Sequence, residues 1–293
     1  MLKISCIGPM NSEERPIYDS PDRRRRGGLR RSHRRPEGSR APARLIALFA
    51  AIVGLIPAST GITSEPDPQK LIDSAEDMVK GETARGTIEM TVTRPDFTRS
   101  MRMKSWWEGN EKALIVIEAP RKDAGNKTLK IGNEMWNYLE NTETTIKVPP
   151  SMMLQSWNGS DFTNDDLVRE SNYAEDYDAS VEGTGEAEGE PYWDLLLRPK
   201  PEAPVVWGKL IYRISKADTL PVRLEYYDEQ GTLKRHLVFS DRDTVGSRVI
   251  PTTWTMYDDT KDGHRTTMEI LEMEFDIEIG DRIFSKRELE SGR

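Results

Sequence analysis

The chain has 293 residues, of which 36 % are hydrophobic and 31 % are charged. This composition excludes a protein that crosses a membrane repeatedly, because such proteins need apolar runs of ~20 residues. Residues 1–61 carry 12 Lys and Arg against five Asp and Glu, whereas residues 62–293 carry 30 against 45. The acidic body would be repelled by phosphate, so nucleic acid is excluded as a partner.

The first 61 residues read as a basic leader followed by a secretory signal peptide at about 43–61. An apolar run of 12 residues, 45–56, follows Arg44 and ends at Pro57 and small residues. This order of basic flank, apolar run and small residues is typical of export. A membrane anchor or a buried helix is the alternative, although the run is short for spanning. With no Cys at its end, we expect a soluble periplasmic protein without a stable membrane anchor.

Residues 67–80 predict an amphipathic helix. The apolar residues recur with a period of 3.6, which gives one buried stripe. Asp67 can cap the start, Pro68 suits the first turn, and Gly81 ends the helix.

Most of the remaining chain predicts strands. Segments with period-2 alternation fall at 87–93, 101–107, 113–118, 128–131, 135–139 and 144–148, and then at 192–197, 210–215, 222–227, 233–240, 249–257 and 266–279. In the last of these, Leu271, Met273 and Phe275 are expected on one face.

Short helices are expected at 151–157, 164–170 and 281–290. Residues 170–190 are rich in acidic residues and are expected to form an exposed hairpin or loop. A calcium site in this acidic segment is the alternative. The glycine after Glu182 falls at the eighth position instead of the sixth that an EF-hand loop needs, so we expect no metal.

This order of elements predicts a mainly β (α+β) fold. About eleven strands with a few short helices and no β-α-β alternation indicate one antiparallel meander, strongly curved or partly closed. No internal repeat is evident, so residues 62–293 are expected to form a single domain.

Catalytic motifs are missing from the sequence, so we do not expect an enzyme. There is no nucleophile elbow, phosphate loop, dinucleotide fingerprint or zinc-protease motif. The only Cys is Cys6, within the leader, and the body holds only His236 and His264, both expected at the surface. We expect no cofactor.

The apolar inventory is unusual, with ten Met and seven Trp after residue 61. Met is flexible and suits surfaces that accept varied apolar partners. One reading is ordinary core. The other is an apolar cavity on the concave face of a curved sheet. The candidate ligand-binding residues of that cavity are Met90, Val92, Met101, Met103, Trp136, Met152, Met153, Trp157, Leu271, Met273 and Phe275.

Several segments resemble the outer-membrane lipoprotein-sorting protein family, the LolA-like group of periplasmic carriers. They are the M-W-x-Y hairpin at 135–138, the basic strand into Pro-Pro at 146–150, and the run G-S-D-F-T-x-x-D-L at 159–167. The segments at 118–120 and 127–129 also fit, and the similarity covers most of residues 70–290. The sequence departs from the family at 139–141 and at Gly125. For the run at 159–167 we expect a mainly structural role, with Gly159 in a tight turn and Asp161 or Thr163 capping a helix.

The resemblance implies an incomplete antiparallel β-barrel of about eleven strands with a lid of short helices and a cavity that holds acyl chains. It implies a lipidated protein or a lipid as partner, and an inner-membrane exporter as a further one. Two other functions stay open from the residues. One is a periplasmic interaction or accessory subunit of an envelope transporter or signalling complex, docking through residues 170–190. The other, ranked last, is a lipase or esterase that uses His236 or His264.

Overall fold

The computed structural model describes residues 66–169, 173–187 and 189–291, which belong to one compact unit, Ile62–Arg293. The expected leader and signal peptide lie outside the described residues, as do Cys6 and Glu170.

The first described element is the helix α1 (Pro68–Lys80), with the caps that its sequence predicts. The side chain of Asp67 accepts a hydrogen bond of 3.1 Å from the backbone N–H of Gln69. Gly81, with a φ of 65°, donates its N–H to the carbonyl of Asp77. The residues of the predicted stripe are buried, namely Leu71, Ile72, Ala75 and Val79.

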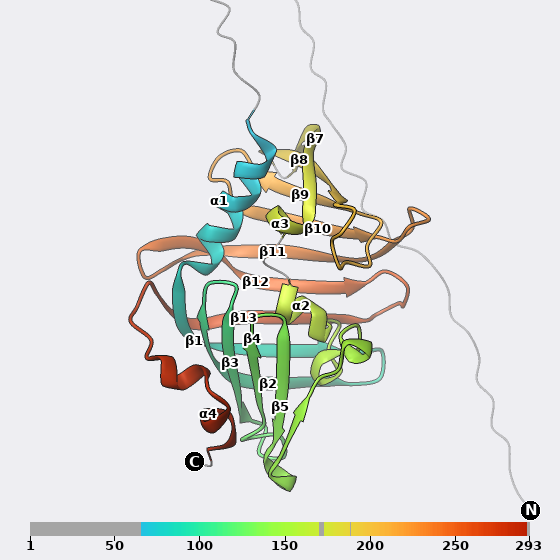
Figure 1. The fold of residues 1–293 in the computed structure, drawn as a ribbon. Helices are drawn as coiled ribbons and strands as arrows, with labels where there is room; N and C mark the ends of the chain where they lie inside the picture. Colours follow the sequence, from blue (N-terminus) through green and yellow to red (C-terminus); the bar gives the residue numbers. More distant parts are fainter. Residues whose placement is uncertain (1–65, 170–172, 188, 292–293) are drawn as a thin grey trace, which may run out of the picture. The chain divides into compact units, whose positions relative to one another are not determined.

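In the described residues, thirteen antiparallel strands form one sheet, rather than the expected eleven or so, and the mainly β class is confirmed (Figure 1). The strands are β1 (Thr83–Thr93), β2 (Thr98–Glu108), β3 (Lys112–Ala119), β4 (Lys127–Ile131), β5 (Glu134–Leu139), β6 (Thr144–Lys147), β7 (Tyr177–Ala187), β8 (Glu190–Pro199), β9 (Lys209–Ser215), β10 (Pro221–Tyr227), β11 (Leu233–Val245), β12 (Arg248–Asp258) and β13 (Arg265–Phe275).

The strand order is β6-β5-β4-β3-β2-β1-β13-β12-β11-β10-β9-β8-β7. The chain therefore starts at the centre of the sheet, runs outward to β6, crosses to the far edge at β7, and returns to pair β13 with β1. Strands β6 and β7 are the two edges, and no pairing between them closes the sheet in the described part of the chain. The result is the incomplete barrel that the resemblance implies.

The crossover between the two meanders and the C-terminal segment hold the remaining helices. The crossover contains the 3₁₀ turns η2 (Pro150–Met152) and η3 (Trp157–Gly159), then α2 (Asn164–Arg169) and α3 (Tyr173–Asp176). The turn η1 (Glu140–Thr142) precedes β6, and η4 (Asp281–Phe284) and α4 (Lys286–Glu290) end the described chain.

One of these local predictions needs correction, and another is confirmed in one of its two forms. Residues 151–157 form no continuous helix, because the chain there makes only the two 3₁₀ turns. The acidic segment contains α3 and strand β7, which forms an antiparallel hairpin with β8, so the hairpin alternative is confirmed.

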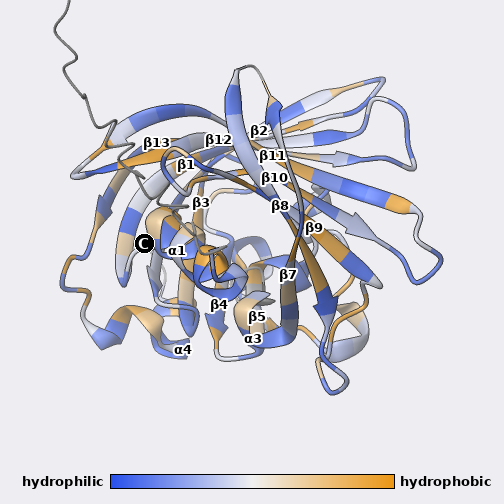
Figure 2. Cartoon of the chain, turned by 90° about the horizontal axis from the view of Figure 1, so that it is seen from above, coloured by the Kyte–Doolittle hydropathy of each residue, from blue (hydrophilic) through white to orange (hydrophobic). Residues whose placement is uncertain are grey.

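The sheet curves around α1 and α3, while α4 lies outside the curve (Figure 2). The concave face carries the main core, which includes Met90, Met101 and Leu197. The convex face of β3–β5 is also covered, because Phe284 and Leu289 of the C-terminal segment pack on Leu129 and neighbouring side chains. Strands β3–β5 are therefore covered on both faces.

Among the described residues, none of the helices combines the length and the apolar character that crossing a membrane would require.

Candidate functional site: an apolar cavity with a cationic end

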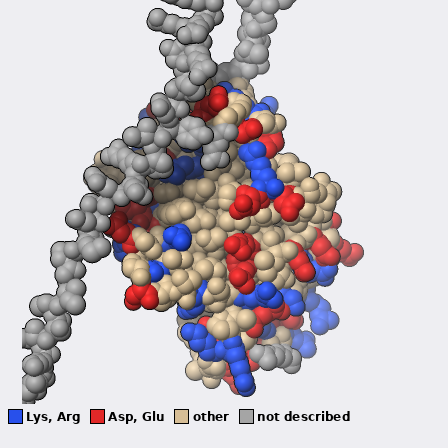
Figure 3. Space-filling view, turned by 180° about the vertical axis from the view of Figure 1, so that it is seen from behind, with Lys and Arg blue, Asp and Glu red and all other residues tan. Residues whose placement is uncertain are grey.

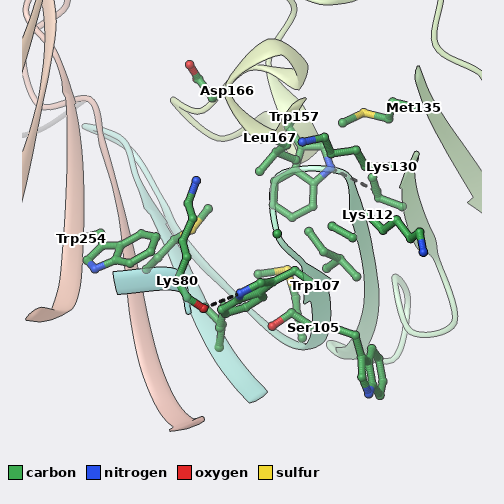
Figure 4. Close-up of a pocket in the computed structure, with 18 residues that line it drawn as sticks. Lys80, Ser105, Trp107, Lys112, Lys130, Met135, Trp157, Asp166, Leu167 and Trp254 are labelled. Atoms are coloured by element: carbon green, nitrogen blue, oxygen red, sulfur yellow. Dashed lines mark hydrogen bonds between the residues drawn. The ribbon is translucent and has the colours of Figure 1, made fainter. Parts of the chain in front are cut away.

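A cavity of about 160 Å³ lies on the concave face of strands β1–β5. Its apolar wall comes from five strands and consists of Ile88, Met103, Ala113, Ile115, Met135 and Met268. The rings of Trp107, Trp157 and Trp254 add aromatic surface around it (Figure 4). Two more open hollows of about 500 and 510 Å³, near Met273 and Asp161, have many charged side chains in their lining. The cavity on β1–β5 is the one suited to an apolar ligand.

The segment 157–167 covers the cavity from the crossover side. Trp157 is 2 % exposed, and its indole N–H donates a hydrogen bond of 3.2 Å to the hydroxyl of Thr128 on β4. Leu167 of α2 also lines the cavity. The backbone reverses at Gly159, whose φ of 72° is the positive value expected for a glycine turn.

Of the two residues expected to cap a helix, Asp161 and Thr163, it is Thr163 that caps α2. Its hydroxyl accepts the N–H of Asp166 at 3.2 Å, and the Asp166 carboxylate accepts the N–H of Thr163 at 2.7 Å. This reciprocal pair is a capping box with Asp in place of the usual Glu. Asp161, the other alternative, has a different role.

Two buried ion pairs fasten this cover to the sheet. Asp166 receives two hydrogen bonds from Arg235 of β11, of 2.7 and 2.5 Å, and both side chains are less than a tenth exposed. Burial alone lowers the pKa of Arg235, but the charge of Asp166 raises it on balance. Asp161 accepts a bond of 2.9 Å from Arg94, which follows β1.

These contacts give the run at 159–167 a structural role. The guanidinium of Arg235 also stacks over Tyr226, at 4.4 Å from the ring centroid, and over Trp207, at 4.8 Å. An arginine that is paired and stacked in this way is held in one orientation. The cover of the cavity is therefore fixed to both meanders.

Two lysines form a cationic end of the cavity. Lys130 of β4 is 6 % exposed, and its ammonium donates a hydrogen bond to the carbonyl oxygen of Asn110. Lys80, the last residue of α1, also lines the cavity. Burial lowers the pKa of Lys130 to about 8, and the positive charge of Lys80 lowers it further, while Glu111 opposes the shift.

A further polar group in the wall is Ser105 of β2, which is 4 % exposed. Its hydroxyl has no hydrogen-bond partner among the residues that the structure describes. An unpaired buried hydroxyl costs about 1–3 kcal/mol, so such groups are unusual in folded proteins.

The structure distributes the eleven predicted cavity residues over several environments. Met103 and Trp157 line the cavity. Met90, Val92 and Met101 lie in the filled core of the same concave face. Their contact with a ligand stays a prediction.

The other six lie elsewhere. Trp136 belongs to the cluster on the convex face, and Met153 packs beside Met135. Met152 and Leu271 are 40 % and 44 % exposed. Met273 is buried and lines the hollow near Gly86, and the ring of Phe275 lies under the guanidinium of Arg248.

A β-bulge explains the position of Leu271. Ile270 pairs with Ile88 and Glu272 with Thr87, so Leu271 is the extra residue and the alternation shifts by one. The expected shared face of Leu271, Met273 and Phe275 is therefore wrong for Leu271. Gly86 pairs with Met273 near this bulge, where a Cβ atom would collide with the backbone oxygen of Glu272.

The polar residues of the site were not predicted from the sequence. Thr128 and Lys130 alternate with the apolar Leu129, which reads as a strand with its polar face in solvent. A local signal that could separate the two faces of β4 is absent, because the alternation does not show which face curves inward.

The two body histidines lie away from the cavity. His236 is on the other face of β11 from Arg235, with its Nδ1 at 2.7 Å from Asp259 and its ring stacked on Tyr257. His264 borders the charged hollow near Asp161. In the described part of the chain, no group of three or more His, Cys, Asp or Glu is placed to hold a metal ion.

Charges of both signs are interspersed on the face seen from behind, around an uncharged area (Figure 3). Elsewhere in the described chain, exposed charges form pairs such as Arg85 with Glu274 and Lys104 with Glu118. The pattern of this face differs from the single-sign stripe that binds nucleic acid.

Comparisons with known proteins agree with this fold. A family model described only as an uncharacterized protein matches residues 109–291. No curated protein matches the chain.

Three solved structures are similar over 76 % of the chain. A DUF1329 family protein from Desulfovibrio piger has a TM-score of 0.70 at 20 % identity, and all of that chain is covered. A LolA superfamily protein from Nitrosomonas europaea has a TM-score of 0.66 at 20 % identity, again with full coverage. An outer-membrane lipoprotein-sorting protein domain from Vibrio parahaemolyticus has a TM-score of 0.65 at 17 % identity, with 98 % covered. At these identities the likeness establishes a LolA-like fold.

Proposed function

The chain belongs to the family whose model matches residues 109–291, and it has a LolA-like fold. On this basis we propose that it is a periplasmic carrier of lipids. The acyl chains of lipoproteins or of other lipids bind in the cavity on the concave face and are carried across the cell envelope. An exporter in the inner membrane is the proposed donor of the cargo.

The observation that carries this proposal is the apolar cavity under the cover 157–167. Its wall of Met, Ile and Trp side chains matches the chemistry of an alkyl chain, and burial of such a chain is favourable by about 25 cal/mol per Å². Flexible Met side chains at Met103, Met135 and Met268 allow the wall to adapt to chains of different shape.

The size of the cavity implies that binding enlarges it. Pockets for drug-sized ligands hold roughly 300–1,000 Å³, whereas this one holds about 160 Å³. The cover 157–167 is fixed by two buried ion pairs. We therefore propose that α1 moves when the cavity opens. Its C-terminal end is held by hydrogen bonds from Trp107 to the carbonyl of Lys80 and from Arg248 to the carbonyl of Asp77.

The test is lipid binding by the full chain, expressed in a periplasm. Native mass spectrometry beside an organic extract should detect bound acyl chains, and the empty protein should take up a fluorescent fatty acid. Ala113→Phe, which places a ring in the cavity, should weaken uptake at least tenfold. Ala217→Phe, at an exposed turn, is the matched control. An Ala113→Phe variant that binds as tightly as the control would exclude this cavity as the site.

A second candidate function is protein docking at β7. This strand is an edge of the sheet, and Asp178, Glu182 and Glu186 lie on its exposed side. Acidic side chains on an edge discourage unspecific strand pairing and attract a basic partner. Reversing these three charges to Lys should abolish capture of such a partner and leave fatty acid uptake unchanged.

A further inference from the structure

We infer that the cavity selects a single-chain amphiphile with an anionic head group, held at the end formed by Lys130 and Lys80. This inference rests on the proposed function, since it takes the cavity as the site of the acyl chain. It narrows the cargo from lipids in general to those that end in a carboxylate or a phosphate.

The first argument is the burial of Lys130 without a counter-ion. Its side chain emerges from β4 on the concave face, beside Ala113 and Met135 in the neighbouring strands. In the described part of the chain it has no carboxylate within ion-pair distance, and its only hydrogen bond goes to the Asn110 carbonyl. Lysine is almost never fully buried unless it is paired. A lone carbonyl also leaves donors of the ammonium unused.

The second argument is the presence of a like charge beside it. Figure 4 shows the amino groups of Lys80 and Lys130 extending to the same side of the cavity, with Trp157 nearby and Ser105 at the opposite side. Two ammonium groups at one end repel each other. An anion beside them would reduce the repulsion and supply the counter-charge that Lys130 lacks. The pKa of Lys130, lowered to about 8 by burial and by Lys80, is the sign of this unfavourable arrangement.

The third argument is the contrast between the two parts of the cavity. Two further charged side chains in the lining are already paired, Lys112 with Glu108 and Asp166 with Arg235. Most of the remaining lining is Met, Ile and Trp, which disfavours a ligand that is polar throughout. A cationic end on an apolar wall is complementary to a charged head on an alkyl tail. The volume of about 160 Å³ favours one chain over two.

The experiment compares ligands of equal chain length and different head groups. A fluorescent fatty acid bound to the full chain is displaced with palmitate, 1-palmitoyl lysophosphatidic acid, hexadecanol and hexadecyltrimethylammonium. We expect at least one of the two anionic ligands to bind tenfold or more tightly than hexadecanol, and the cationic ligand to bind most weakly. The affinity for palmitate, compared with that for the lysophosphatidic acid, then shows whether a carboxylate or a phosphate is the preferred head group.

The variant Lys130→Met keeps the length of the side chain and removes its charge. It should reduce the preference for the anion to less than threefold while leaving the affinity for hexadecanol within twofold of the wild type. Lys130→Arg should retain the preference, and Lys122→Met, at an exposed loop, should change neither value. Binding of hexadecanol by Lys130→Met reports that the variant is folded.

The outcomes separate the two proposals. Equal affinity of the wild type for palmitate, the lysophosphatidic acid and hexadecanol would overturn the anionic selectivity while supporting acyl binding. An unchanged preference in Lys130→Met would likewise overturn the role of Lys130. If none of the four ligands displaces the probe or binds, the proposed carrier function itself fails.

Discussion

The two halves of the sheet share one topology and differ in how their concave faces are filled. Strands β1–β5 face a cavity of about 160 Å³, whereas the gaps between the helices and β7–β12 hold only about 30 and 40 Å³. In the second half, α1 inserts its apolar stripe and Tyr173 of α3 contacts the rings of Tyr177 and Tyr212. The first half receives Trp157 and Leu167.

This difference shows that the cavity arises from what covers the sheet. Both halves offer an alternating strand face with buried apolar residues, and either could form a solid core. Side chains of α1 and α3 fill the concave face of one half. The cover 157–167, hereafter the roof, spans the other half and is fixed in place. Two charged side chains of this roof, Asp161 and Asp166, are paired with Arg94 and Arg235, so they do not neutralise the lysines of the cavity.

The largest expected effect comes from detaching the roof. Asp166→Ala leaves Arg235 buried without a counter-ion, which should lower the free energy of unfolding by about 3–5 kcal/mol. Urea denaturation measures this loss. Glu274→Ala, in the exposed pair with Arg85, is the control and should cost less than about 1 kcal/mol. A similar small loss at Asp166 would mean that the roof is not fastened by this pair.

The packing of the two halves can be compared by making the same substitution, Met to Ala, in each. Met256 is fully buried on β12 in the packed core, and Met103 lines the cavity. Met256→Ala should cost about 2–5 kcal/mol, because a new cavity forms in a filled core. Met103→Ala should cost roughly 1–2 kcal/mol, since this side chain already lacks neighbours on one side. Equal losses in urea denaturation would show that the two faces are packed alike.

A buried carboxyl group of α1, that of Glu76, makes the stability of the packed half depend on pH. Burial raises the pKa of Glu76 to about 8, against the opposing effect of Lys80, while Asp73 and Asp77 add to the rise. The folded chain therefore keeps this proton between pH 4.5 and about 8, where the unfolded chain has released it. The free energy of unfolding should fall as the pH rises through this window.

Glu76→Gln should remove that fall. We expect the variant to be more stable than the wild type by on the order of 2 kcal/mol at pH 8, and by nearly nothing at pH 4.5. Thermal unfolding at a series of pH values checks the slope. Parallel curves for variant and wild type would contradict the buried position of the carboxyl.

The sequence predicted the fold better than it predicted the site, for a physical reason. The spacing of apolar residues and the capping residues predict α1 and most strands, because both signals depend on residues that are near one another in the sequence. The face on which a side chain ends depends on register and on distant elements. The bulge beside Ile270 turned Leu271 outward, and η4 and α4 buried Trp136 on the convex side.

The same limit explains why Lys130 was not foreseen. A lysine between apolar neighbours in a strand predicts a solvent-facing side chain, and in most sheets with one covered face that interpretation holds. Here both faces of β4 are covered, by the roof on one side and by the C-terminal segment on the other. The local pattern contains no information about either cover.

The smallest expected effect concerns the stability of the cationic end. The pKa of Lys130 falls from its ordinary 10.5 to about 8 through burial and the charge of Lys80, with Glu111 opposing. Below pH 8 the folded chain holds an ammonium that the unfolded chain holds more favourably, so the residue destabilises the fold. As the pH rises toward 10.5, this destabilisation disappears.

Lys130→Met should therefore stabilise the protein at pH 7, by on the order of 1 kcal/mol after the loss of the bond to Asn110, and less at pH 10. Chemical denaturation at the two pH values measures both differences. A residue that lowers stability while it raises affinity for an anion is maintained for binding. Loss of stability in this variant at pH 7 would instead identify Lys130 as a structural tie between β4 and the turn at Asn110.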